Sequence, residues 1–89
     1  MDEKNEKIPS FLKIKEYKQQ FIRLWENFTE KFSELGFHLK LDFNTNIMII
    51  YYKKSWQIYQ VYRFKEFKKI SEVVSFMEDI HASVKFALL

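Results

Sequence analysis

Apolar residues recur at steps of three or four over the first third of the chain, and they predict one long helix from about Phe11 to Leu35. Ser10 is of a type that caps a helix start, and Gly36 stands where a left-handed residue ends a helix. The predicted inward stripe comprises Ile14, Tyr17, Phe21, Leu24, Phe28, Phe32 and Leu35.

The period then changes to two, which predicts strands. Apolar residues alternate with His38, Lys40 and Asp42 over residues 37–43, so we expect a first strand with one polar face. Residues 44–46 predict a turn, and residues 47–52 and 56–64 predict a second and a third strand. Connections this short favour an antiparallel meander with the first strand at an edge and the second in the centre.

A second helix is predicted from about Ser71 to Leu88, with Ser71 as its cap and Glu72 near the positive end of its dipole. Its inward stripe is Val73, Met77, Ile80, Val84 and Leu88. We therefore predict an α+β fold: a long N-terminal helix, a three-stranded antiparallel meander and a C-terminal helix, with both helices packed on one sheet face. Residues 9–89 form the single domain, and residues 1–8 form a disordered tail.

The second strand is apolar on both faces, although a sheet covered by helices on one side needs only one apolar face. A three-residue turn would pair Phe43 with Ile47 and direct Ile47, Ile49 and Tyr51 toward the helices. A two-residue turn would direct them outward and turn Met48, Ile50 and Tyr52 inward. Either way a far face rich in apolar side chains remains, unless the first helix or residues 86–89 cover it. We expect this face to bind a protein partner or a second copy. On the third strand, either Tyr59 and Val61 or Trp56, Ile58 and Tyr62 would join this face. The predicted interface residues are Ile49, Tyr51, Tyr52, Tyr59 and Val61.

Composition narrows the classes of function. The chain has 89 residues, 47% of them hydrophobic, and no cysteine, which excludes disulfides, thiolate catalysis and Cys-based metal sites. No apolar run approaches the roughly 20 residues of a membrane span, and the charged N-terminus is not a signal peptide, so we expect a cytoplasmic protein. Of the 15 basic residues 13 are Lys, a bias typical of an AT-rich genome such as that of a low-GC bacterium or its phage.

The net charge of +3 is unevenly distributed. Residues 53–69 hold six basic residues and only one acidic residue, Glu66. They predict either a solvated surface or an anion site that binds nucleic acid. The basic residues are Lys53, Lys54, Arg63, Lys65, Lys68 and Lys69, and they divide between the two ends of the predicted hairpin.

The predicted element order, with Lys65, Lys68 and Lys69 before the second helix, resembles that of double-stranded-RNA-binding domains. Those domains have a longer connection between the first two strands, which reaches a minor groove. Residues 44–46 are too short for that, so we assign no family, because element order alone does not transfer function.

Catalysis has little support in the sequence. Neither His38 nor His81 belongs to a catalytic constellation of nucleophile and carboxylate at characteristic spacings. The Glu78-x-x-His81 spacing is that of carboxylate-bridged di-iron bundles, which need further Glu-bearing helices. The remaining candidates, Glu26, Glu30 and Glu34, form the exposed ridge of the first helix. We predict no enzyme, metal, cofactor or small-molecule substrate, but a small regulatory or inhibitory protein that binds a protein partner as a homodimer. The alternative is a nucleic-acid-binding module.

Overall fold

The N-terminal helical region consists of two parts. The computed structural model describes residues 8–89, so the predicted tail lies outside the described residues apart from Ile8. A 3-10 turn, Ser10–Lys13, precedes helix α1, Lys15–Glu34, and the extended Ile14 separates the two. The predicted single helix from residue 11 was therefore wrong at its start. Ser10 is not the cap of α1, because Ile14 occupies that position without a side-chain hydrogen bond.

Helix α1 ends where the sequence predicts. Gly36 has a φ of 97°, in the left-handed region that an L side chain rarely adopts. Its N–H donates to the carbonyl of Ser33 at 3.0 Å, which satisfies one of the last carbonyls of the helix. Phe32 and Phe37, on either side of this turn, are both buried. The helix end thus carries the chain directly into the sheet.

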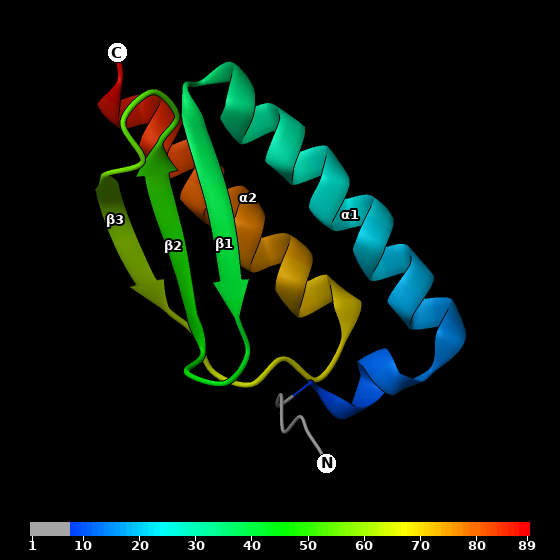
Figure 1. Ribbon diagram of the computed structural model, residues 1–89. Helices are drawn as coiled ribbons and strands as arrows, with labels where there is room; N and C mark the ends of the chain where they lie inside the picture. Colours follow the sequence, from blue (N-terminus) through cyan, green and yellow to red (C-terminus); the bar gives the residue numbers. More distant parts are fainter. Residues whose placement is uncertain (1–7) are drawn as a thin grey trace.

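Three antiparallel strands form one sheet in the order β1-β2-β3 (Figure 1). They are β1, Phe37–Asp42; β2, Ile47–Tyr52; and β3, Ile58–Arg63. The central place of β2 is as predicted, and β3 is shorter than the predicted residues 56–64. The meander follows from the two short loops that join the strands.

The length of the β1–β2 loop determines which residues of β2 face the helices. Asp42 pairs with Ile47, so four residues separate the strands, and neither predicted turn length is correct. A carboxylate oxygen of Asp42 accepts the N–H of Asn44 at 2.8 Å, and Asn46 adopts a φ of 55°. An even number of loop residues has the same effect on the faces as the predicted two-residue turn. Met48, Ile50 and Tyr52 therefore share a face with Phe37, Leu39 and Leu41.

Helix α2, Ile70–Ala87, packs its stripe of Val73, Met77, Ile80 and Val84 into the core. Leu88, which we expected in that stripe, lies past the helix end and is exposed. In Figure 1, α2 crosses behind the sheet and α1 lies beside it next to β1, so the molecule has a sheet layer and a helix layer. The predicted α+β class, with both helices on one sheet face, is confirmed. The core is formed by Phe28, Phe32, Phe37, Met48, Ile50, Phe67 and the α2 stripe.

Candidate interaction surfaces

The sheet face that points away from the helices has one polar strand and two apolar ones. Cross-strand partners share a face. Lys40 is paired with Ile49, and Ile49 with Val61, which places all three on this outer face. Tyr51 is paired with His38 on β1 and with Ile58 on β3, so these three residues also lie on the outer face. The polar side of β1 that the alternation predicts is thus confirmed, and it borders an apolar area on β2 and β3.

A β-bulge enlarges the apolar area. Tyr51 pairs with Ile58 and Ile50 with Gln60, so Tyr59 is an extra residue in β3. Strict alternation would have put Ile58 and Val61 on opposite faces, and the bulge brings both to the outer face. They are 57% and 43% exposed, respectively. We define the outer apolar patch as Ile47, Ile49, Tyr51, Trp56, Ile58 and Val61.

Trp56 extends this patch from the β2–β3 loop. Its side chain is 63% exposed, and its ring lies 4.2 Å from that of His38, nearly parallel, with Tyr51 at 6.0 Å. The backbone of Trp56 has a φ of 59°, which is unusual for a bulky residue. Two hydrogen bonds enforce it, because the N–H of Trp56 donates to the carbonyl of Tyr52 and the N–H of Tyr52 donates to the carbonyl of Gln57. The loop therefore holds a large apolar ring on the surface at the expense of backbone strain.

The five residues predicted as an interface divide between the two faces. Ile49, Tyr51 and Val61 lie together on the outer face. Tyr59 packs on the core with its ring 4.6 Å from that of Phe37. Tyr52 is 44% exposed but stands on the inner face, beside the same two rings. The sequence predicts Trp56 and Ile58 on the outer face only as the alternative to Tyr59 and Val61. The structure places Ile58 there together with Val61, because of a bulge for which the sequence pattern contains no signal.

The predicted basic cluster forms two separate groups. Lys53 and Lys54 follow β2, and the Lys53 ammonium donates to the hydroxyl of Ser33 on α1 at 2.8 Å. Arg63 ends β3 at the other end of the sheet, and the remaining lysines precede α2. A six-residue strand separates the groups by about 20 Å. The structure therefore does not bring the six basic residues into one site.

The start of α2 is occupied by a carboxylate of the chain itself. Glu72, in the first turn, accepts the N–H of Lys68 at 2.6 Å, one residue before the N-cap Lys69, and Ser71 makes no cap. A hollow beside this helix start is lined by Lys65 and Lys68 but also by Glu66 and Glu72. Two acidic groups among the cations weaken an anion site at this position.

Each of the two histidines lies against an aromatic ring, His38 against Trp56 and His81 against Phe32. His81 packs edge-on against Phe32, with 5.1 Å between ring centres. Burial lowers the pKa of His81, and the nearby cations Lys31 and Lys85 lower it further. Over residues 8–89, no group of three or more His, Asp or Glu side chains is placed to hold a metal ion.

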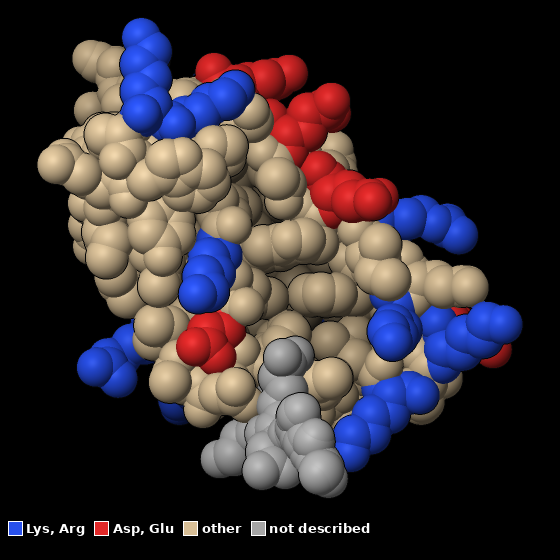
Figure 2. Space-filling model, in the orientation of Figure 1, with Lys and Arg blue, Asp and Glu red and all other residues tan. Residues whose placement is uncertain are grey.

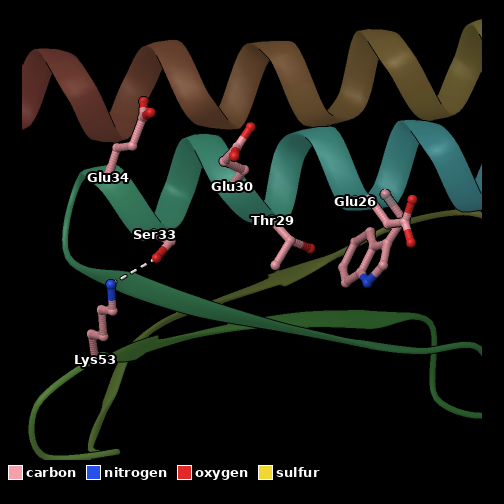
Figure 3. A pocket seen from close by; sticks show the side chains of 7 residues that line it. Glu26, Thr29, Glu30, Ser33, Glu34 and Lys53 are labelled. Carbon is pink, nitrogen blue, oxygen red and sulfur yellow. Dashed lines mark hydrogen bonds between the residues drawn. The ribbon is translucent and has the colours of Figure 1, made fainter.

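A groove of about 610 Å³ lies beside α1 (Figure 3). It contains the acidic ridge formed by Glu26, Glu30 and Glu34. It is lined by Trp25, Glu26, Thr29, Glu30, Ser33, Glu34 and Lys53. The hydroxyl oxygen of Thr29 is buried and makes no hydrogen bond within the described part of the chain. Figure 2 shows the acidic side chains gathered along the C-terminal half of α1, whereas uncharged atoms dominate the surface over β2 and β3.

Comparison with family models, with curated proteins and with solved structures gives no significant match for this chain. No helix in the described range is both long and apolar enough to cross a membrane. The function must therefore be inferred from the surfaces themselves.

Proposed function

We propose that this chain is a small, non-enzymatic regulatory protein of the cytoplasm that binds a protein partner through its outer apolar patch. One observation supports this most directly: within residues 8–89 the helices cover only the inner face of the sheet, and the outer face carries six apolar side chains on β2, β3 and the loop between them. Contiguous apolar surface of this kind marks association sites in soluble proteins.

The proposed partner is a second copy of the chain. The patch has an apolar centre on β2 and β3 and a polar border on β1 and at Arg63, which is the arrangement of an interface core with its rim. Three strands of six residues present an area of about 15 by 20 Å, which is smaller than the roughly 800 Å² per partner of a standard interface. We therefore expect a weak, concentration-dependent homodimer rather than a permanent one.

Sedimentation equilibrium over a concentration series tests this proposal. Val61→Lys and Ile58→Lys each place a charge on the patch at a half-exposed or exposed position, so the fold should persist while the dimer dissociates. Glu78→Lys, on exposed α2 surface, is the matched control and should leave association unchanged. A strict monomer at millimolar concentration would contradict the homodimer. Unchanged association in both patch variants would contradict the patch.

Nucleic-acid binding through residues 53–69 stays a prediction, and the geometry supports it less well. The cations form two groups at opposite ends of the sheet, and the carboxylate of Glu72 already occupies the start of α2. The outer face offers Tyr51 and Trp56 for base stacking, but the other apolar side chains on this face are aliphatic Ile and Val. This pattern suits a protein surface better than a base-stacking platform.

A further inference from the structure

The groove beside α1 lies next to β1, which is one of the two edge strands of the sheet (Figure 3). Trp25, Thr29 and Ser33 line the groove and lie one helical turn apart. Thr29 and Ser33 point from α1 toward the strands, and the bond from Lys53 to Ser33 closes one end (Figure 3). The groove therefore has a helix as one wall and lies next to β1. An extended chain can add to an edge strand through its backbone hydrogen-bonding groups.

The backbone of β1 is available on that side. The N–H of Lys53 donates to the carbonyl of Gly36, so Gly36 bonds toward β2. Backbone groups alternate in direction along a strand, so those of Phe37, Leu39 and Leu41 point to the free edge. Within the described chain no strand pairs there, because β1 ends the sheet order. Leu39 and Leu41 are only half-buried, as expected for side chains next to an open edge.

The charge of the groove selects the partner. Glu26, Glu30 and Glu34 line it, and Lys53 is the single cation among the lining residues. This acidic strip lies on a chain whose net charge is +3, so it stands out from the rest of the surface (Figure 2). Lysines on an added strand, on the side that faces α1, would reach these carboxylates.

We propose that β1 and the acidic groove of α1 form a second interaction surface, which binds an extended, lysine-rich segment of another protein as an antiparallel fourth strand. A second copy of β1 fits poorly. Antiparallel self-pairing centred on Lys40 would bring Lys40 opposite Lys40 of the other copy, and like charges directly opposite are unfavourable. This surface is separate from the outer apolar patch, so it does not depend on the proposed dimer.

The probe is a capped hexapeptide that alternates Lys with Val or Thr, titrated into the isotopically labelled full chain and followed by NMR. In antiparallel pairing, the peptide residues opposite Phe37, Leu39 and Leu41 share their face and direct their N–H groups at β1. We expect amide shifts at Leu39 and Leu41 and a shift of the Thr29 methyl group. N-methylation of the lysines should weaken binding at least about tenfold, because it removes the bonding N–H groups. N-methylation of the intervening residues should leave the affinity within about threefold, because those N–H groups face solvent.

Protein variants test the charge. Replacing Glu26, Glu30 and Glu34 together by Gln should weaken the peptide about tenfold and reduce its salt dependence, because three exposed carboxylates lose their attraction. The control, Glu78→Gln with Asp79→Asn on α2, should bind as the unmodified chain does. Equal effects of the two N-methylation patterns, or equal binding of a peptide with Glu in place of Lys, would overturn the proposal. Shifts at Leu39 and Leu41 that depend on protein concentration without peptide would assign the edge to a second copy and also overturn it.

Discussion

The indole ring of Trp56 lies 4.2 Å from the imidazole ring of His38 at an angle of 13°, so a loop residue and an edge-strand residue form one stacked pair. The pair links β1, to which His38 belongs, to the loop that follows β2. In this arrangement the backbone of Trp56 has a φ of 59°, in the left-handed region. The loop thus combines a favourable ring contact with an unfavourable backbone conformation.

Two substitutions at Trp56 separate these effects. Trp56→Ala removes the ring but keeps the strained backbone, whereas Trp56→Gly removes both. We expect the Gly variant to be more stable than the Ala variant by about 1 kcal/mol, from urea unfolding. Both should weaken self-association equally if the ring belongs to the interface. An Ala variant as stable as the Gly variant would show that the backbone at this position is not strained.

His81 should make stability depend on pH. Burial lowers its pKa in the folded chain below the ordinary 6.5, so the unfolded chain takes up the proton first as the pH falls. Its contribution is therefore complete above about pH 6.5, declines below it, and levels off once the pH is under the folded pKa. His81→Phe keeps the edge contact with Phe32 and should lack this decline. Urea unfolding at several pH values measures both, and parallel curves for the two proteins would contradict the prediction.

Thr29→Val should stabilise the fold. The hydroxyl oxygen of Thr29 is buried without a hydrogen bond, and Val has nearly the same shape. Removing an unsatisfied buried polar atom is expected to raise the free energy of unfolding by about 1 kcal/mol. Ser75→Val, at an exposed helical position on α2, is the control and should change it by less than about 0.5 kcal/mol. A destabilised Thr29→Val variant would mean that the hydroxyl has a partner in solution.

Glu72→Ala should destabilise α2 at its start. The lost bond is the one from the N–H of Lys68 to the carboxylate, and capping interactions of this kind contribute about 1 kcal/mol. Glu72→Gln retains an acceptor but not the charge, so an intermediate loss is expected. Glu78→Ala, within the same helix and exposed, serves as the control. Thermal unfolding followed by circular dichroism compares the three variants.

Oligonucleotide binding should be negligible. Because the two basic groups lie at opposite ends of the sheet, neither gathers enough cations for strong phosphate binding. We expect no measurable affinity for single-stranded or duplex RNA at about 50 mM salt, where electrostatic binding is strong. A salt-dependent affinity that is lost when Lys65, Lys68 and Lys69 are changed to Glu would instead establish the nucleic-acid function.

Periodicity predicted the element order because each element has a strong local signal. Gly36 occupies a helix end that requires a positive φ, and the alternation around His38 and Lys40 requires a strand with one wet face. Both signals depend on a residue's own conformation or on its immediate neighbours. The structure agrees with the sequence at these positions.

The faces of the sheet depended on details that periodicity does not contain. The four-residue β1–β2 loop is held by the bond between Asp42 and Asn44, and one residue more or fewer would reverse β2. This β1–β2 register turns Tyr52 inward, and the bulge at Tyr59 shifts the alternation of β3 and turns Tyr59 inward as well. A local pattern identifies a strand but does not determine its register with the neighbouring strands.

The two tryptophans of the chain lie on different surfaces, Trp25 in the groove of α1 and Trp56 on the outer patch. Each surface therefore has its own built-in fluorophore. A Trp56→Phe variant would emit only from the groove, and a Trp25→Phe variant only from the outer patch. Emission from these single-tryptophan proteins would report dimer formation and peptide docking independently, without any attached dye.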